Sequence, residues 1–383
     1  MREELASQLS RYLREVVEPA AGLMATGHGA DPREVVAQAG AHGLAGLLIP
    51  PEFGGSGCSY VEFAQVIEQV ASVCASTAVI LDVHASVAVH PLIHYGSAAQ
   101  KSEWLPRLAS GEMVGAFALT EPGAGSDAAS ATTAAHPSTH GWSITGAKLF
   151  ITNCGAADLY LVIARTGGPG ASGLSAFLVE RADRGVAPGR RLEKMGLHGS
   201  WTGELLLQEV AVTPSRLLGG LGEGFRIAME ALDVGRIGIA AQAVGIARGA
   251  LALVGDREGQ RSVEGERAGS SSAVPAHVVA DMVTSTEAAW QLAVSAARAA
   301  DRRAPSTFLA SAAKLVATDN AMHVTEGVLD LLGLAAGFGD HPAAVRFCDA
   351  KACQIYEGTN QIQRIVIARE LSSGVTGRSD RGR

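Results

Sequence analysis

The spacing of apolar residues changes twice along the chain, and this order of elements restricts the possible folds more than any other feature. Between about residues 114 and 214, short apolar runs such as 159–163 and 205–207 lie between glycine, proline and aspartate, as is typical of β-strands. Apolar residues before and after this region repeat at helical spacing. Because helices and strands do not alternate, the order disfavours a parallel dinucleotide-binding sheet and predicts an α+β fold.

The same changes of period predict three domains and a tail. They are an N-terminal all-α domain over residues 1–113, a middle β-domain over 114–219, a C-terminal helical bundle over 220–371 and a frayed tail over 372–383. The long helices expected in the bundle cover about residues 225–254, 276–300, 306–332 and 341–371. The tail is expected to fray because it has lost its apolar residues.

Helix boundaries are marked clearly in the N-terminal region. The apolar helical face over residues 5–16 is expected to end at Pro19, because proline lacks the backbone N–H. Asp31, followed by a proline, predicts an N-cap and the first position of the next helix. Ser59 and Glu62 have the spacing of a capping box and predict a further helix start.

Composition restricts the partners and the cellular location. The 383 residues contain 31 Lys and Arg against 38 Asp and Glu, a net charge of −7, which disfavours nucleic acid as a partner. The mean hydropathy is +0.18, but the richest apolar stretch, residues 77–93, is interrupted by Asp82, His84 and His90, so no membrane span is predicted. Five cysteines without a C-x-x-C spacing, and the lack of a signal-peptide pattern, predict reduced thiols in a cytoplasmic protein.

Common metal and hydrolase motifs do not occur in the sequence. His323 and Glu326 lie three positions apart without a second histidine, so we predict a solvated pair and no metal site. Neither G-x-S-x-G nor G-x-x-x-x-G-K-[ST] is found, which disfavours the most frequent hydrolase and nucleoside-triphosphate sites.

Three segments contain residues suited to ligand binding or proton transfer. Residues 117–127 hold glycines that let the backbone approach a ligand, beside hydroxyl side chains, with a plain turn as the alternative. Residues 146–153 place an aromatic residue two positions before a hydroxyl on a strand, with an ordinary edge strand as the alternative. Residues 354–363 place Glu357 among apolar residues before a glycine, where a helix stops or kinks. A buried carboxyl has a raised pKa and suits a base, whereas a surface glutamate is the alternative.

Together these segments resemble motifs of the acyl-CoA dehydrogenase family, and the resemblance covers nearly the whole chain. The matching segments are residues 51–55, 95–101, 105–112, 117–127 and 355–363, together with 194–200 and 232–240, which are most similar to the short-chain branch. The resemblance implies an N-terminal helical domain, a middle β-domain and a C-terminal four-helix bundle. It also implies a homo-oligomer, either a dimer or a tetramer.

The resemblance further implies FAD as the cofactor and assigns residues to two sites. FAD would be bound by Phe117, Leu119, Thr120, Gly125, Ser126, Phe150, Ile151, Thr152, Arg261, Thr359, Asn360 and Gln361. The acyl thioester would be contacted by Ser126, Asp233, Arg236 and Gly358. Phe150 and Thr152 would lie along the isoalloxazine ring, whereas Arg261 and residues 359–361 would hold the adenosine and pyrophosphate end, partly across a subunit interface.

The implied activity is the α,β-dehydrogenation of a short-chain acyl thioester, carried by coenzyme A or by an acyl carrier protein. Glu357 would remove the α-proton as the catalytic base, while a hydride leaves the β-carbon for flavin N5. An electron-transfer flavoprotein would then accept the electrons. The alternatives are a flavin oxidase or monooxygenase on the same scaffold, and a non-catalytic member with weakened FAD binding.

Two positions bear on cofactor binding and on substrate choice among the members that the resemblance covers. The aromatic residue expected three positions after Arg261 is replaced by Glu264, which predicts weaker FAD binding through lost apolar contact and like-charge repulsion. Isovaleryl-type members have their glutamate immediately before the arginine that matches Arg236, and that position here is Gly235. Proton transfer is therefore left to Glu357, and straight short chains are expected to be preferred over 3-methyl-branched ones.

Overall fold

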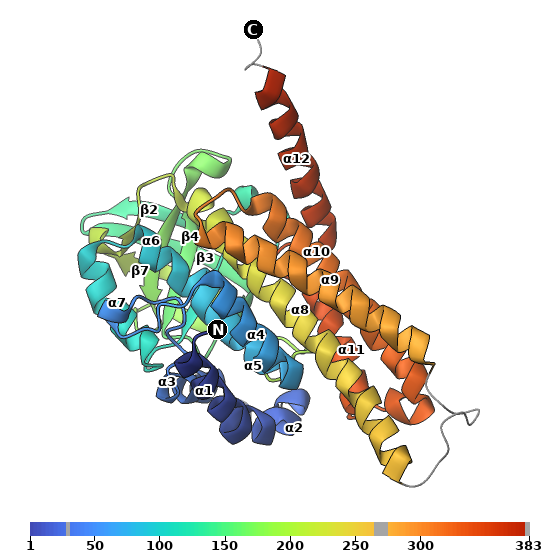
Figure 1. Ribbon diagram of the computed structural model, residues 1–383. Helices are drawn as coiled ribbons and strands as arrows, with labels where there is room; N and C mark the ends of the chain where they lie inside the picture. The colour runs from blue at the N-terminus through green and yellow to red at the C-terminus, as the bar shows by residue number, and fades with distance from the viewer. Residues whose placement is uncertain (28–30, 264–274, 380–383) are drawn as a thin grey trace.

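The computed structural model describes residues 1–27, 31–263 and 275–379, and its architecture confirms the predicted α+β class. Helices α1–α7 form the N-terminal part, an eight-stranded sheet follows, and helices α8–α12 form the C-terminal part (Figure 1). Helices α8, α9 and α10 lie side by side, and α8 also packs against α4 and α5 of the N-terminal part (Figure 1). One long helix therefore contacts both helical regions of the protein.

The N-terminal part consists of α-helices, two π-helical turns and the short 3-10 helix η2 Pro51–Phe53. Their bounds are α1 Glu3–Tyr12, η1 Leu13–Val17, α2 Glu18–Thr26, α3 Pro32–Ala41, α4 Tyr60–Val73, α5 Ala75–Val83, η3 His84–Val89, α6 His90–Tyr95 and α7 Ala98–Ala109. The predicted helix end at Pro19 is wrong, because the chain passes through the π-turn η1 and continues as α2. Pro19 lies in the first turn of α2, where its missing N–H costs little.

The predicted helix starts are confirmed by their capping hydrogen bonds. The Asp31 carboxylate accepts a hydrogen bond of 2.9 Å from the Arg33 amide at the start of α3. The Ser59 hydroxyl oxygen accepts one of 3.1 Å from the Glu62 amide, and the Glu62 carboxylate accepts one of 3.2 Å from the Ser59 amide. The capping box read from the sequence is thus present at the start of α4.

Two helical stretches have the length and hydropathy of a membrane span, contrary to the expectation drawn from residues 77–93. They are Ala75–Tyr95, which comprises α5, η3 and α6, and Gly224–Gly255. Their most apolar windows are 94% and 78% buried inside the protein. Since the core helices of soluble proteins pass the same test, length and composition are weak evidence for a membrane here.

The middle part is one sheet in which β3 occupies an interior position. The strands are β1 Gly115–Ala118, β2 Ala134–Ser138, β3 Gly141–Thr152, β4 Leu159–Arg165, β5 Leu174–Glu180, β6 Val186–Arg191, β7 Thr202–Val212 and β8 Leu217–Leu218. Their order is β6-β7-β3-β2-β4-β5-β8, and β1 pairs in parallel with β4. Because β3 pairs with both β2 and β7, the edge-strand alternative is wrong. The register of β3 shifts between Lys148 and Ile151, so a bulge contains Phe150.

In the C-terminal part, one predicted helix is divided into two, and the second of these continues beyond the predicted end. Its helices are α8 Gly224–Val263, α9 Ala276–Asp301, α10 Thr307–Leu332, α11 Pro342–Cys353 and α12 Asn360–Ser379. The single helix predicted over 341–371 is broken by a loop, because Glu357 and Gly358 adopt left-handed backbone angles with φ of 53° and 89°. Helix α12 runs past the predicted end at residue 371 to Ser379, since no proline interrupts its backbone hydrogen bonds.

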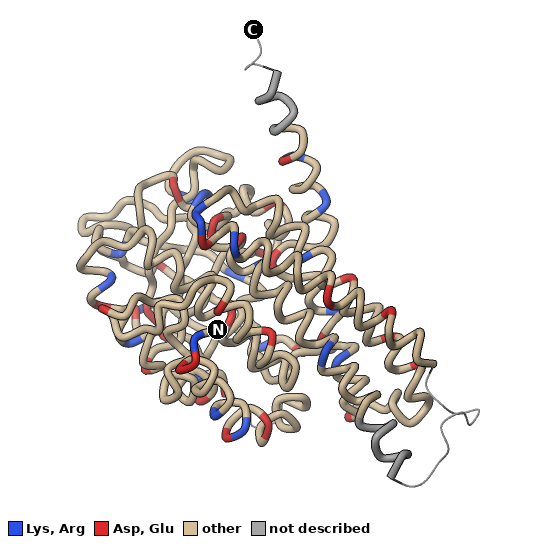
Figure 2. Tube along the Cα trace, in the orientation of Figure 1, with Lys and Arg blue, Asp and Glu red and all other residues tan. Residues whose placement is uncertain are grey.

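The charges of the described residues are mixed along the chain. Figure 2 shows Lys and Arg interspersed with Asp and Glu on helices and loops of all three parts. In this view, the Lys and Arg residues of the described chain do not gather into a stripe.

Candidate active site

The loop between α11 and α12 holds Glu357 in an uncommon backbone conformation. The loop is closed by a hydrogen bond of 3.0 Å from the Asn360 amide to the Gln354 carbonyl oxygen. Glu357 has a φ of 53°, which is rare for a residue with a side chain and costs about 1–3 kcal/mol. Such strain persists only where the surroundings impose it, so the loop is a candidate for a functional segment.

Helix α8 provides space for the Glu357 carboxylate by having a glycine opposite it. A Cβ atom added at Gly235 would lie 2.1 Å from Glu357 Oε2 and 2.8 Å from Cδ. Both carboxylate oxygens are inaccessible to solvent and have no hydrogen-bond partner among the described residues. Burial raises the pKa of Glu357 to about 7, although the charges of Arg236 and Lys314 act in the opposite direction. A carboxyl with such a pKa is able to accept a proton near neutral pH.

Two buried cations lie on the helices beside this loop. Arg236 is 4% exposed and donates a hydrogen bond of 2.7 Å to the Asp233 carboxylate. Lys314, which is fully buried in α10, donates bonds of 2.8 Å to the Gly358 carbonyl oxygen and 2.9 Å to Asn360 Oδ1. Burial lowers the pKa of Lys314 to about 8, against the opposing charge of Glu357. Lys314 holds the loop in position, and the charges of both cations offset part of the cost of a charged Glu357.

The glycine-rich segment after β1 is anchored by an ion pair inside the sheet. Lys148 is fully buried and contacts Glu121 at 2.8 Å, and it also donates to the Leu119 carbonyl oxygen at 2.9 Å. The Glu121 carboxylate accepts further bonds from the Thr132 and Thr133 amides. Burial alone would raise the pKa of Glu121, but Lys148 and these donors outweigh it and lower the pKa to about 2. The segment is therefore fixed at the residue that precedes its glycines.

Beyond this anchor, the β-side offers an exposed aromatic ring near an open loop. The Leu149 amide donates a hydrogen bond of 2.8 Å to the Thr120 carbonyl oxygen, which joins β3 to the glycine-rich segment. The next residue, Phe150, is 61% exposed with a left-handed φ of 61° in the bulge of β3. A Cβ at Gly125 would meet nothing within 4 Å, so the loop leaves room for a ligand. An exposed ring beside hydroxyls and open backbone fits a planar cofactor with phosphates, as FAD is.

The predicted site residues fall into two groups in the structure. Of the residues assigned to the acyl thioester, Asp233 and Arg236 lie on α8 and Gly358 lies in the loop beside Glu357. Ser126 lies instead in the segment after β1. Phe117, Leu119, Thr120, Gly125, Ser126, Phe150, Ile151 and Thr152 lie on β1, on β3 and on the segment after β1. Thr359, Asn360 and Gln361 lie at the start of α12. The side-chain amide of Asn360 donates hydrogen bonds to Thr318 and Asp319 inside the bundle.

Arg261, which was predicted to bind FAD, is separated from these groups along α8. Arg261 is near the end of α8, about 38 Å along the helix from Arg236 at the usual rise per residue, and its side chain lies outside the described residues. Glu264 also lies outside the described residues, so its expected effect on FAD remains a prediction.

Several residues of the site were missed by sequence reasoning. Lys314 and Gln363 both bind the Gly358 carbonyl oxygen, at 2.8 Å and 2.9 Å, and so hold the loop that contains Glu357. Asp82 is fully buried beside the same face of α8. The only sequence signal was that Lys314 and Asp82 each interrupt an apolar stretch of helix.

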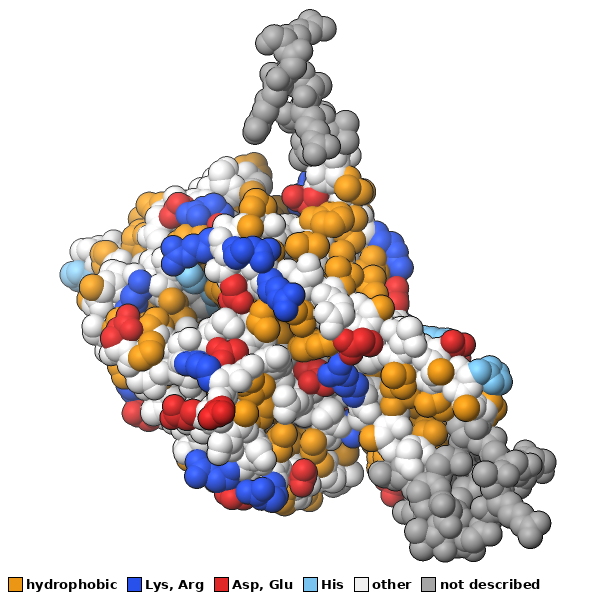
Figure 3. Space-filling view, viewed as in Figure 1, with side chains coloured by type: hydrophobic (Ala, Val, Ile, Leu, Met, Phe, Trp, Pro, Cys, Tyr) orange, Lys and Arg blue, Asp and Glu red, His pale blue; other side chains and the backbone are white. Residues whose placement is uncertain are grey.

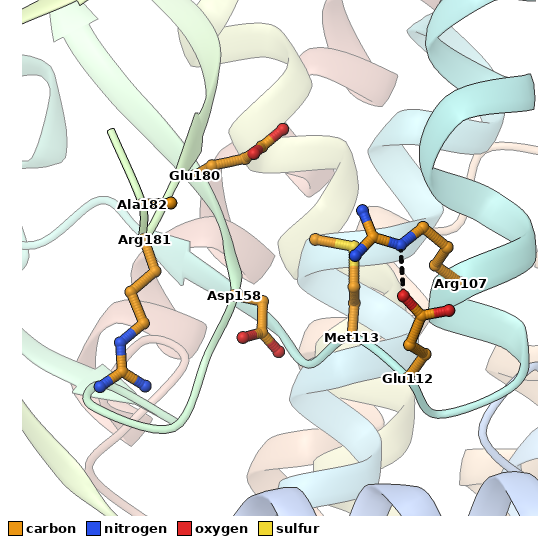
Figure 4. Close-up of a pocket in the computed structure, with 7 residues that line it drawn as sticks. All are labelled: Arg107, Glu112, Met113, Asp158, Glu180, Arg181 and Ala182. Carbon is orange, nitrogen blue, oxygen red and sulfur yellow. Dashed lines mark hydrogen bonds and ion pairs between the residues drawn. The ribbon is translucent and has the colours of Figure 1, made fainter. Parts of the chain in front are cut away.

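A surface pocket lies between α7 and the sheet, and none of its lining residues was predicted to bind a ligand. It has a volume of about 370 Å³ and is lined by charged side chains from three segments (Figure 4). Arg107 donates to Glu112 at 2.7 Å, and Asp158 accepts a bond of 3.0 Å from the Val114 amide. None of the lining residues belongs to the Glu357 loop or to the glycine-rich segment, so the pocket does not form part of the candidate site.

The fold and the placement of Glu357 define a class of three-part proteins with helical, β and helical regions, and the comparisons identify the family. Residues 2–112 match the acyl-CoA dehydrogenase N-terminal domain, 116–210 the middle domain and 222–372 the C-terminal domain. The chain belongs to the acyl-CoA dehydrogenase family.

Individual relatives match over nearly their whole length. An acyl-CoA dehydrogenase of Bacillus subtilis (strain 168) is 41% identical over 95% of this chain and 96% of its own. The structure of butyryl-CoA dehydrogenase from Megasphaera elsdenii is 35% identical, covers 97% of this chain and 98% of its own, and superposes with a TM-score of 0.90. A chain in a structure titled as an electron transferring flavoprotein of Acidaminococcus fermentans is 38% identical, with coverages of 97% and 98% and a TM-score of 0.91.

Proposed function

We propose that the protein is an FAD-dependent dehydrogenase that introduces an α,β double bond into a short-chain acyl-CoA, with Glu357 as the base. The observation that supports this most directly is the Glu357 carboxylate, which is shielded from solvent and unpartnered against Gly235. A carboxyl in that state is free to meet a carbon acid, whereas a structural carboxylate is normally paired. The bound flavin supplies the hydride acceptor for this chemistry, and the ring of Phe150 and the segment after β1 offer the surface that holds it.

The residues around Glu357 have roles that follow from their contacts. At its pKa of about 7, the carboxyl is ionised in a large fraction of molecules at neutral pH and accepts the α-proton. The Glu357 amide N–H has no partner among the described residues, so it is available to donate to the thioester carbonyl as enolate charge develops. Lys314 holds the loop through its bond to the Gly358 carbonyl oxygen, and Arg236 adds a second positive charge near the carboxylate. The Glu357 carboxylate oxygens are shielded from solvent, which keeps water away from the proton transfer.

The substrate class follows from Gly235 and from the relatives. Butyryl-CoA is the substrate named for the Megasphaera elsdenii protein, a four-carbon straight chain. Because Gly235 bears no side chain, it cannot serve as the base, and the space it leaves is filled by Glu357. We therefore expect straight short chains to be preferred over 3-methyl-branched ones, with coenzyme A as the carrier and an acyl carrier protein as the second candidate.

Further features support an oligomer and an external electron acceptor. Large apolar side chains are exposed on α10 to α12 and on the turns between them, notably Leu334 at 86%, Phe338 at 63% and Ile365 at 61%. Figure 3 shows apolar side chains gathered over the C-terminal bundle. Such surfaces mark protein interfaces, so we propose a dimer or tetramer and an electron-transfer flavoprotein as the acceptor. The five cysteines are unpaired, which suits a cytoplasmic location.

Anaerobic reduction of the bound flavin tests the proposed function. The purified protein should be yellow, and butyryl-CoA should bleach the flavin absorbance and yield the enoyl thioester. Glu357→Gln should keep the yellow colour and lose bleaching, because the amide cannot accept the proton. Oxygen consumption with turnover would favour an oxidase, and a colourless wild type that does not take up added FAD would contradict the proposal.

A further inference from the structure

Asp82 is a buried acid for which the protein provides no partner. It lies near the end of α5, directly before the π-turn η3, and its side chain is fully buried. Neither Oδ1 nor Oδ2 has a hydrogen-bond partner among the described residues. Leaving a buried carboxyl without a partner costs free energy, so a native protein keeps one where another molecule or a function requires it. Single π-turns in helices are also frequent at functional sites.

The Asp82 carboxyl lies beside the carboxyl of Glu357, along one face of α8. A Cβ added at Gly238 would lie 2.0 Å from Asp82 Oδ1, just as one added at Gly235 would lie 2.1 Å from Glu357 Oε2. Residues three apart in a helix share a face, with about 5–6 Å between them. We call Gly235 and Gly238 the glycine face of α8. Burial and then the charge of Glu357 raise the pKa of Asp82 well above its ordinary value.

The other polar groups near the glycine face already have hydrogen-bond partners. The Tyr356 hydroxyl donates to Gln242 Oε1, and Gln242 Nε2 donates at 2.9 Å to the Ala75 carbonyl oxygen. The Asp82 backbone carbonyl accepts a bond of 2.7 Å from the Ser86 hydroxyl. Among the described residues, the Asp82 carboxyl is therefore left without a hydrogen bond at Gly238, as the Glu357 carboxyl is at Gly235.

We propose that Asp82 is a specificity-determining residue, which hydrogen-bonds a hydroxyl group carried by the acyl chain of the substrate beyond its two reacting carbons. The inference rests on the proposed function, because Glu357 has to meet the α-carbon for the rest of the chain to lie along the glycine face. A carboxyl accepts a hydrogen bond from a hydroxyl group, and in its protonated form it also donates one to the hydroxyl oxygen. A purely hydrocarbon chain would leave Asp82 unpaired, which is the arrangement that sites of this kind discriminate against.

Four thioesters and two variants test the assignment. Butyryl-CoA and valeryl-CoA are compared with 4-hydroxybutyryl-CoA and 5-hydroxyvaleryl-CoA by anaerobic flavin reduction, and kcat/KM is measured for each. The wild type should prefer the better hydroxylated substrate over its unsubstituted counterpart by at least about tenfold. Asp82→Leu, which has the same branching as Asp but is apolar and larger, should reverse this order and raise kcat/KM for butyryl-CoA. Asp82→Asn keeps a donor and an acceptor and should retain most of the preference.

The outcomes separate this inference from the proposed function. The role of Asp82 is overturned if Asp82→Leu leaves the ratio of kcat/KM between hydroxylated and unsubstituted thioesters unchanged. It is also overturned if both variants lose activity equally on all four thioesters. Either result leaves the proposed dehydrogenation standing. Failure of all four thioesters to reduce the flavin in the wild type overturns both. Thermal unfolding shows whether the variants are folded, and Asp82→Ala, which also removes both polar atoms, supplies the ratio should Asp82→Leu unfold.

Discussion

Gly235→Ala is the substitution that tests most directly whether the space opposite Glu357 matters. The added Cβ would lie 2.1 Å from Oε2, whereas ordinary contacts of a Cβ begin at 3.4 Å. The carboxylate must therefore move by at least 3.4 − 2.1 = 1.3 Å, or the helix must shift. A displacement of about 1 Å in a reacting group costs about 10²-fold in rate. We expect flavin reduction by butyryl-CoA to slow about a hundredfold, or about 2.7 kcal/mol in the barrier.

The assay is stopped-flow bleaching of the flavin under anaerobic conditions, together with thermal unfolding. Gly255→Ala is the matched control, because Gly255 lies on the same helix and its Cβ would meet nothing within 4 Å. That control should keep the wild-type rate and gain up to about 1 kcal/mol of stability from helix propensity. A wild-type rate in a folded Gly235→Ala variant would refute the argument that this glycine makes room for the base.

Four further predictions concern Glu357 and Glu264. Glu357→Gln should bind FAD and reduce it at least about 10²–10⁴-fold more slowly, measured in the same assay. In the wild type, the rate should rise with pH up to about pH 7 and then level, because the base has to be ionised. Since the folded pKa of Glu357 exceeds its ordinary value of 4.5, Glu357→Gln should gain stability relative to the wild type as pH rises from about 4.5 to 7, by up to about 3 kcal/mol in denaturant titrations. Glu264→Phe should tighten FAD binding in fluorescence titrations, whereas an unchanged affinity would show that residue 264 does not contact the cofactor.

Local signals in the sequence were sufficient for much of the fold. The capping box of Ser59 and Glu62 requires only neighbouring residues, and it is present as predicted. The helix end predicted at Pro19 was wrong because the π-turn before it rearranges the helix hydrogen bonds. Residue propensities do not predict such a turn. The break at Glu357 was indicated by the glycine after it, yet the left-handed conformation of Glu357 itself depends on Lys314 and Gln363 from other parts of the chain.

The site shows why pattern reasoning found the base but not its neighbour. Glu357 belongs to a contiguous motif, whereas Asp82 reaches the same face of α8 from a position 275 residues earlier in the chain. In the sequence, Asp82 interrupts an apolar helix and reads as an argument against a membrane span. Only the tertiary contact with Gly238 shows that this acid lies next to the base.

The two glycines of α8 also explain how one helix face accommodates two acids. A side chain at position 235 and the carboxylate of Glu357 would occupy the same space, since their atoms would be only 2.1 Å apart. A glutamate located at 235 and one located at 357 are therefore mutually exclusive arrangements in this fold. At Gly238, any side chain would likewise displace the carboxyl of Asp82. The glycine face thus sets both the position of the proton acceptor and the chemical character of the space beside it.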